Sequence, residues 1–280
     1  MSVELGRYGF WRRLAGFTPE LAREVEALGY GALWIGGSPP ADLTEVEGLL
    51  AATDRIAVAT GIVNMWASPA AEVAGSYHRI ASRYPGRFLL GVGIGHPEAT
   101  REYTSPYQTM VAYLDVLDEH EVPIADRALA ALRPKALALA AERTAGTHPY
   151  LTTPDHTRTA REQIGAGVLL APEQTAVIAT DADREEARAT ARGWIGRYLG
   201  LRNYVANLRS LGFTEADVAD GGSDRLVDAL VTQGDAAAVA ARLDEHLAAG
   251  ADHVCLQLLG GDGEDPLRAL RSVAEALSLH

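Results

Sequence analysis

Short apolar runs alternate with longer amphipathic segments along the whole chain. We expect strands at residues 6–11, 32–36, 56–65, 88–95, 127–132, 147–151, 168–171 (extending as far as 180) and 253–259. Most of these runs are continuously apolar, which is typical of parallel strands buried on both faces. Because strands and helices alternate, the pattern predicts βαβ units and a parallel sheet.

Capping side chains followed by proline mark the expected starts of four helices. They are Thr18-Pro19, Ser68-Pro69, Thr153-Pro154 and Asp265-Pro266. Proline suits the first helical position because an N–H group there would have no acceptor within the helix. Ser, Thr and Asp side chains accept hydrogen bonds from the first free N–H groups. Gly250 is placed to end the helix before the last strand.

About eight such units favour an α/β fold, specifically a (β/α)8 TIM barrel. A longer, more polar stretch interrupts the alternation at about 183–232, and we expect it to be a helical insertion before the last strand. No linker rich in Gly, Ser or Pro divides the sequence, so we interpret residues 1–280 as one TIM-barrel domain.

Composition and charge narrow the range of partners. The chain is 48% hydrophobic and 22% charged, which is ordinary for a globular protein. Its formal net charge of −12 disfavours binding to nucleic acid or to an anionic membrane surface. We therefore expect a small-molecule substrate.

Cysteine usage and the amino terminus predict a cytoplasmic protein. The single cysteine, Cys255, cannot form an intrachain disulfide and lies in an apolar run, so we interpret it as a core residue. The amino terminus lacks the features of a secretory leader, and no apolar stretch approaches the length of a membrane helix. The eight histidines form no metal-binding motif, so we expect no metal.

Candidate functional residues follow the expected strands, because active sites in TIM barrels lie at the carboxyl ends of the strands. The run from Gly91 to His96 has the spacing G-x-G-x-G, which does not match the dinucleotide-binding fingerprint. Glycines here either let a flat ligand approach the backbone or give packing room. His96 and His148 both stand at strand ends, where an imidazole can exchange a proton near neutral pH.

Hydroxyl and aromatic side chains also gather at the expected strand ends. Thr152 and Thr153 precede a helix, where they form either an anion site or, for Thr153, only an N-cap. Trp11, Trp34 and Trp66 fall near the ends of the first three strands, where they either wall a planar ligand or fill the core.

The sequence resembles the luciferase-like flavin superfamily, in its branch of oxidoreductases that use coenzyme F420, a 5-deazaflavin. The resemblance covers nearly the whole chain and includes the segments YPGRFLLGVGIGH, THPYLTTPDHT, YVANLRSLGFTEADVADGGSDRLVDALV and GADHVCLQLL. It implies a cytoplasmic homodimer that binds F420 and transfers a hydride at C5 of the deazaflavin.

The resemblance also assigns site residues. It implies a cis peptide bond at Gly61-Ile62 against one face of the deazaflavin, and a polar contact from Asn64. The residues expected to bind the cofactor are Gly61, Ile62, Asn64, Gly95, His96, His148, Pro149, Tyr150, Thr152 and Thr153. Arg12, Arg101 and Arg225 are candidates to bind its phosphate and acidic tail.

The sequence departs from the sugar-phosphate dehydrogenases of this superfamily at the proton-transfer positions. Gly36-Gly37-Ser38 replaces their Asp-His pair, and His96 stands where they have an acidic glutamate. We therefore expect His96 to be the catalytic proton donor or acceptor. Trp11, Ser38 and Trp66 are expected to contact the substrate. The alternatives are an FMN-dependent monooxygenase of the same superfamily and a barrel that binds flavin without catalysis.

Overall fold

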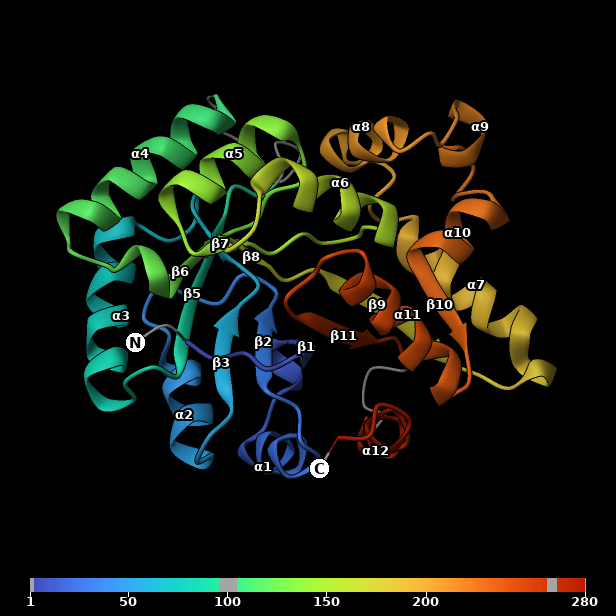
Figure 1. Ribbon diagram of the computed structural model, residues 1–280, viewed down its shortest axis with the longest axis horizontal. Helices are drawn as coiled ribbons and strands as arrows, with labels where there is room; N and C mark the ends of the chain where they lie inside the picture. The colour runs from blue at the N-terminus through green and yellow to red at the C-terminus, as the bar shows by residue number, and fades with distance from the viewer. Residues whose placement is uncertain (1–2, 96–104, 261–265, 280) are drawn as a thin grey trace.

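A parallel sheet curls into a barrel with helices around its outside (Figure 1). The computed structural model describes residues 3–95, 105–260 and 266–279. The strands are β1 (Tyr8–Arg13), β2 (Ala32–Gly36), β3 (Ala57–Thr60), β4 (Val63–Asn64), β5 (Phe88–Gly93), β6 (Arg127–Leu129), β7 (Gly146–Thr147), β8 (Leu169–Leu170), β9 (Glu173–Ile178), β10 (Val231–Gly234) and β11 (Val254–Leu258). The predicted TIM-barrel fold is confirmed.

The segment from β8 to β9 closes the barrel because it pairs on both sides. On one side, Ala171 N donates to Thr147 O at 2.9 Å, beyond the pairing of β8 with β7. On the other side, Cys255 N donates to Pro172 O at 3.0 Å, and β9 continues beside β11. β11 in turn pairs with β1. Pro172 has no N–H group to donate, and it stands at the break between β8 and β9.

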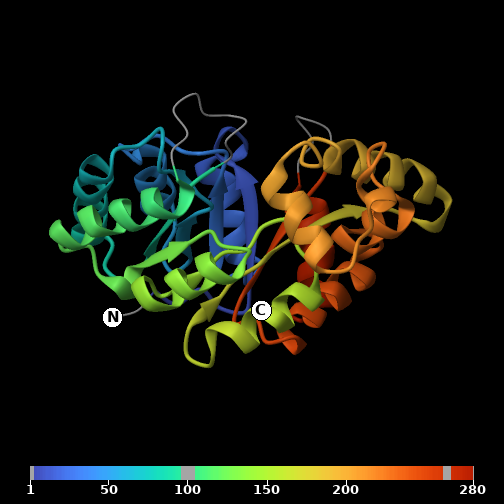
Figure 2. The ribbon, with the colours of Figure 1, turned by 90° about the horizontal axis from the view of Figure 1, so that it is seen from above.

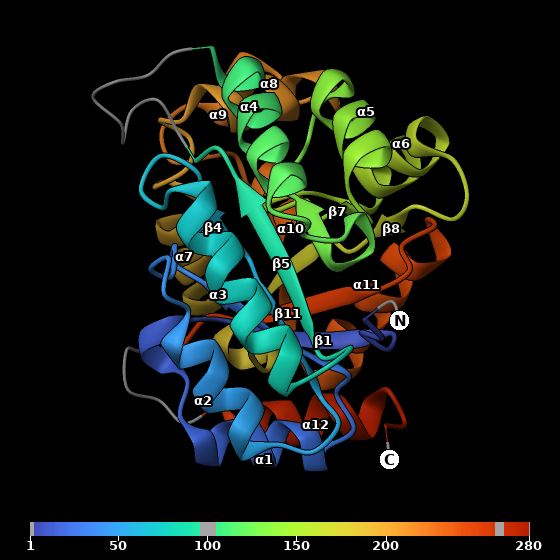
Figure 3. The same ribbon diagram turned by 90° about the vertical axis from the view of Figure 1, so that its left-hand side faces the viewer.

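In the described part of the chain, eight helices cover the outside of the barrel. They are α1 (Pro19–Ala27), α2 (Thr44–Ala52), α3 (Ala70–Arg83), α4 (Pro106–Glu119), α5 (Pro134–Arg143), α6 (Pro154–Ile164), α11 (Ala236–Ala248) and α12 (Leu267–Ala276). Thr18 and Thr153 cap α1 and α6 through their side chains, as predicted. Figure 3 shows α3 and α4 side by side next to β5.

Two helix starts and several strand bounds differ from the prediction. α3 begins at Ala70 with Pro69 at the cap, one residue later than Ser68-Pro69 indicates. α12 begins at Leu267 with Pro266 at the cap, one residue later than Asp265-Pro266 indicates, and Asp265 itself lies outside the described residues. β7 is only two residues long, because the chain turns at Leu151, which has a left-handed φ of 55°.

Side chains alternate between the inside of the barrel and its helical coat. Trp34, Ala59 and Leu89 belong to a cluster that joins residues from β1, β2, β3, β5, β6 and β11, which only the barrel interior can bring together. Their neighbours Leu33 and Ile35 pack in the larger cluster with the helices. Cys255 is buried in the inner cluster, so its interpretation as a core residue is confirmed.

The expected insertion forms α7 (Arg184–Ile195), α8 (Arg202–Ser210), α9 (Glu215–Val218) and α10 (Asp224–Leu230). Figure 2 shows these helices on the opposite side of the molecule from α3 and α4. Their buried residues Trp194, Leu208 and Leu226 form a hydrophobic cluster together with Leu151 and Val177 of the barrel. The insertion ends in β10, a strand the sequence analysis did not predict, which extends the sheet along β9.

Within the described residues, no helix combines the length and hydrophobicity that a membrane crossing requires.

Candidate functional site

We call the end of the barrel at which the strands reach their carboxyl ends the mouth. One layer of inward-facing residues lies beneath it. Parallel pairing places Trp11 in register with Trp34 on one side and with Gln257 on the other, and Gln257 with Thr175 of β9. Because residues in register on parallel strands share a face, these side chains form one level of the barrel. The next residues along the strands form the rim.

Strand 3 of the barrel breaks at the mouth. β3 ends at Thr60, β4 begins at Val63, and the bond between Gly61 and Ile62 is a cis peptide, as the resemblance implied. The Trp11 Nε1 group donates to Gly61 O at 3.3 Å. A β-carbon added at Gly61 would lie 2.9 Å from His148 Nε2 and 3.0 Å from Trp11 Nε1. A side chain at position 61 would therefore collide with His148 and Trp11, so the close packing at this point requires glycine.

His148 presents a hydrogen-bond acceptor at the same point. It is 1% exposed, and its ring stacks on Trp34 with the centroids 4.1 Å apart. Its Nδ1 lies 2.7 Å from Ala171 O, so Nδ1 carries the proton and Nε2 has a free lone pair. Burial lowers the pKa of His148 to about 4, which makes the ring neutral at pH 7. Among the described residues, Nε2 has no hydrogen-bond partner.

Trp34 is a core residue rather than a ligand wall. It is 0% exposed, and its Nε1 donates to His253 Nε2 at 2.9 Å. His253 is itself fixed by Gly6 O, which lies 2.8 Å from Nδ1. Both indole and imidazole are thus satisfied within the barrel, and of the two readings for Trp34 the core reading holds.

Asn64 and Gly95 lie together where β4 and β5 end. Asn64 Oδ1 accepts from Trp66 N at 2.9 Å, and a β-carbon at Gly95 would lie 2.9 Å from Asn64 Nδ2. Gly95 has φ of 64°, a conformation that favours glycine. Trp66 is half-buried at the end of this turn.

Tyr150 crosses the mouth from the end of β7 toward β11. Its hydroxyl donates to Gln257 Oε1 at 2.8 Å and lies 3.1 Å from the Tyr198 hydroxyl. Its ring packs against Trp11, with the centroids 5.4 Å apart. Burial, and next the charge of Glu173, raise the pKa of Tyr150 well above its usual value, so the phenol is a neutral donor.

Of the two hydroxyl groups in the predicted anion site, the Thr153 hydroxyl is already used within the protein and the Thr152 hydroxyl is not. Thr153 Oγ1 accepts from His156 N at 3.3 Å, so this side chain caps α6. Thr152 is 1% exposed, and its Oγ1 has no hydrogen-bond partner among the described residues. Pro149, also assigned to the cofactor, is buried beside His148.

A pocket of about 860 Å³ opens beside the mouth. Trp11 and Gln257 line it at its inner end, and Trp194 lines it from α7. Arg12, Arg13 and Arg197 line it as well. Arg12 was predicted to bind an anion; Arg13 and Arg197 were not predicted.

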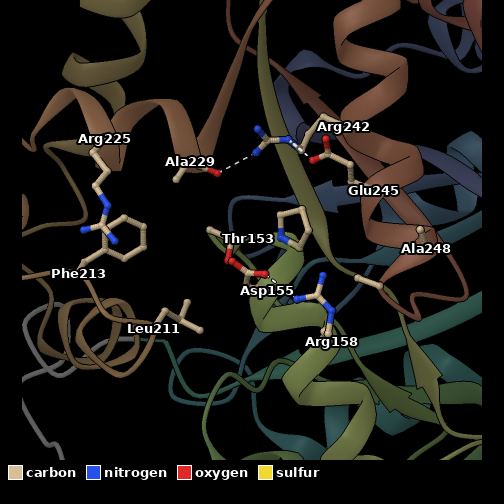
Figure 4. Close-up of a pocket in the computed structure, with 12 residues that line it drawn as sticks. Thr153, Asp155, Arg158, Leu211, Phe213, Arg225, Ala229, Arg242, Glu245 and Ala248 are labelled. Atoms are coloured by element: carbon tan, nitrogen blue, oxygen red, sulfur yellow. Dashed lines mark hydrogen bonds and ion pairs between the residues drawn. The ribbon is translucent and has the colours of Figure 1, made fainter.

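A second pocket, of about 530 Å³, lies between α6, α10 and α11 (Figure 4). It contains Arg225, the other candidate for the anionic part of the cofactor. Arg225 pairs with Asp217 at 2.9 Å and lies over the Phe213 ring at 4.7 Å. Thr153 lines this pocket too, so the structure brings Thr153 and Arg225 together away from Trp11.

Three predicted site residues are not found at the mouth or in either pocket among the described residues. His96 and Arg101 lie outside the described residues, so the catalytic role of His96 stays a prediction. Ser38 is exposed in a left-handed turn after β2, with φ of 57°, and lines neither pocket.

Glu173 is the main site residue that the sequence analysis missed. It is 1% exposed at the start of β9; its carboxylate accepts from the Thr175 hydroxyl and, at 3.4 Å, from Leu151 N. Burial raises its pKa to about 8. A lone acidic residue between Pro172 and an apolar run was the available signal, since charged residues are rarely fully buried without a reason. Gln257, a lone polar residue in the last strand, gave a similar signal.

No group of His, Cys, Asp or Glu within residues 3–95, 105–260 and 266–279 is arranged to hold a metal ion.

Comparison with known proteins adds a family and several structural neighbours. Residues 15–121 match the model of the luciferase-like monooxygenase family, and no curated protein matches the sequence. An F420-dependent secondary alcohol dehydrogenase, solved with an F420-acetone adduct, superposes with a TM-score of 0.75 at 16% identity, over 98% of this chain and 99% of that one. The F420-dependent tetrahydromethanopterin reductase from Methanopyrus kandleri gives 0.69 at 16% identity, with the same coverage.

An FMN-containing enzyme is similar to almost the same degree. The oxygenating constituent of 3,6-diketocamphane monooxygenase from Pseudomonas putida, in complex with FMN, gives a TM-score of 0.68 at 15% identity, over 97% of this chain and 98% of that one. These identities establish a shared fold. The family match covers residues 15–121, and the fold of the whole chain is the one that these solved structures share.

Proposed function

We propose that this protein is an oxidoreductase that uses coenzyme F420 to transfer a hydride to or from a small organic substrate. The observation that carries the proposal is the break in strand 3 at the mouth, where the bare backbone of Gly61 lies against Trp11 and against His148 Nε2, which has no hydrogen-bond partner among the described residues. Similarity of fold to two F420-dependent enzymes over nearly the whole chain supports it.

The residues at the mouth fit a flat heterocycle with hydrogen-bonding edges. His148 Nε2 and Thr152 Oγ1 are buried polar atoms without partners among the described residues, and such atoms normally have one. Gly61 and Gly95 offer backbone without a side chain. Flat, mostly apolar ligands are typically held by such a combination of open surface and few polar groups.

Each residue has a distinct role in this proposal. His148 Nε2 accepts a hydrogen bond from an N–H or O–H group of the ligand, and Thr152 Oγ1 offers a second polar contact. Gly61, Ile62, Asn64 and Gly95 form the backing surface. When bound, a 5-deazaflavin supplies hydride transfer at its C5 atom. The protein then needs no nucleophile of its own, and its contribution is alignment and exclusion of water.

The proton that accompanies hydride transfer needs a donor or acceptor, and we assign this role to His96. The Tyr150 hydroxyl, in the described part of the mouth, donates its one hydrogen to Gln257 Oε1, so it does not take this role in the proposal.

The alternative is an FMN-dependent monooxygenase, which the similarity to the Pseudomonas putida enzyme supports. A barrel that binds flavin without catalysis is the third possibility, and turnover separates it from the other two.

Anaerobic oxidation of reduced F420 by a panel of ketones and enones tests the proposal. We expect turnover by the wild-type protein and a loss of about tenfold or more in Gly61→Ala, because the new methyl group meets His148 and Trp11 in the mouth. Gly48→Ala is the matched control, since Gly48 is exposed in α2 with no atom within 4 Å of the added carbon. It should keep wild-type activity.

Oxygen consumption with reduced FMN, without turnover of F420, would contradict the proposal and favour the monooxygenase. Equal activity of Gly61→Ala and Gly48→Ala would move the cofactor away from the strand break.

A further inference from the structure

The pocket beside the mouth is lined by three arginines in a protein of net negative charge. Arg12 and Arg13 come from the end of β1, and Arg197 follows α7, so three arginines from two distant segments line one space. None of the three forms an ion pair with any residue in the described part of the chain. With a net charge of −12, carboxylates are abundant, and most other arginines have found one.

The second pocket provides an internal comparison. It also contains three arginines, but each has a carboxylate partner. Figure 4 shows Arg158 with Asp155, at 2.6 Å, and Arg242 with Glu245, at 2.9 Å. Arg225 pairs with Asp217 at 2.9 Å. Their charges are therefore compensated within the protein. Among the described residues, the arginines beside the mouth have no such carboxylate partner.

Apolar and aromatic groups complete the pocket. Trp11 and Trp194 line it together with Leu258 and Leu259. A volume of about 860 Å³ lies within the range typical of small-molecule sites, about 300–1,000 Å³. Aromatic walls with a few charged groups suit a molecule that has a planar body and an anionic end.

Arg13 and Arg197 influence Tyr198 through their charge, and Tyr198 contacts Tyr150 at the mouth. The positive charges of Arg13 and Arg197 both act on the Tyr198 hydroxyl, where they partly oppose the rise in pKa that burial causes. That hydroxyl lies 3.1 Å from the hydroxyl of Tyr150. The charged end of the pocket is thus one tyrosine away from the group that crosses the mouth.

We propose that this pocket is the substrate site and that it takes an organic anion, whose carboxylate binds Arg13 and Arg197 while its planar body lies against Trp11 and Trp194. The assignment as substrate site rests on the function proposed above. Binding of the anion itself does not, because it depends only on residues of this chain.

A pair of probes that differ only in charge tests the proposal. Cinnamate and cinnamamide have the same planar body, and their affinities can be measured by calorimetry on the full-length protein, with and without F420. We expect cinnamate to bind about tenfold more tightly, since hydrogen bonds to charged groups are worth more than neutral ones. Arg13→Ala and Arg197→Ala should each remove about that advantage and leave cinnamamide binding unchanged.

Arg55→Ala is the control, because Arg55 is exposed before β3, at the end of the barrel opposite the mouth. It should leave both affinities unchanged. Equal binding of the two probes by the wild type, or equal losses of both in the arginine variants, would overturn the proposal.

A further comparison separates a substrate from the acidic tail of the cofactor. The same variants are titrated with F420 and with the tail-free deazaflavin that lacks phosphate and glutamates. If the variants weaken F420 alone and leave cinnamate binding intact, the arginines serve the cofactor tail and the substrate proposal is wrong. If no deazaflavin binds but cinnamate still discriminates, the anion site stands and the cofactor assignment fails.

Discussion

Burial inside the barrel changes the protonation of one carboxyl group, that of Glu173. Its carboxyl is buried with two hydrogen-bond donors, and its pKa rises to about 8 because ionisation would place a charge in a site with little solvation. The folded protein therefore holds a proton near neutral pH that the unfolded chain releases. The free energy of unfolding should therefore fall as pH rises from the ordinary pKa of a glutamate, 4.5, to the raised pKa of about 8.

Glu173→Gln tests this dependence on pH. Between pH 6.5 and 8, the wild type should lose up to about 1.4 kcal/mol of unfolding free energy per pH unit because of Glu173, and the variant should lack that loss. The buried histidines His148 and His253 act in the opposite direction: their pKa values of about 4 cost stability as pH falls from about 6.5, below this window.

Urea unfolding at several pH values measures the slope. Glu119→Gln removes an exposed carboxyl at the end of α4 and should keep the wild-type slope. A wild-type slope in Glu173→Gln as well would show that Glu173 is ionised in the folded protein.

At the residue scale, the sequence predicted where residues lie in the barrel better than it predicted which groups their side chains contact. Strand ends identified Trp11, Asn64 and His148, because the active end of a parallel barrel follows from strand order alone. The sequence could not show that Trp34 turns inward to meet His253, or that Thr153 is used as a cap. These outcomes depend on contacts between residues far apart in the chain, such as the pair Trp34 and His253.

Among the elements, β6 is joined to its flanking helices through one carboxylate. Asp118 of α4 contacts both Arg127 of β6 and Arg143 at the end of α5. The Arg127 side chain is wholly buried, whereas Arg143 is partly exposed. Asp115 pairs with Arg143 alone, at 2.8 Å. The two aspartates therefore differ in whether their loss leaves a buried charge without a counter-ion.

Asp118→Ala should destabilise the protein by about 3 kcal/mol, because it leaves the buried Arg127 guanidinium uncompensated. Asp115→Ala removes only an exposed pair and should cost less than about 1 kcal/mol. Chemical denaturation of both variants measures the difference. Similar small losses in the two would mean that Arg127 is satisfied by its hydrogen bond to Arg143 O alone.

Strand positions and two of the helix starts, at Thr18 and Thr153, followed from the sequence, because apolar runs and capping motifs are local signals. β10 did not, because its four residues follow α10 directly and pair with β9 only through the tertiary fold. The break between β3 and β4 was anticipated from the resemblance and not from the pattern of residues, which reads as one continuous strand from 56 to 65.

At the scale of the whole molecule, the net charge bears on which ligands the protein attracts, and the fold was predictable from the sequence. The overall charge of −12 gives no general attraction for an anion, so an anionic cofactor or substrate depends on local arginines at the mouth. The barrel was predictable because its βα period runs along the entire chain. The choice between deazaflavin and flavin was not, since solved structures of F420-dependent and FMN-containing enzymes have this fold at similar TM-scores.

Titration of the purified protein with F420 and, separately, with FMN tests the central claim most directly. The account predicts saturable binding of F420 that is tighter than binding of FMN and is weakened in Gly61→Ala. Tighter binding of FMN, or no binding of F420 at all, would contradict it.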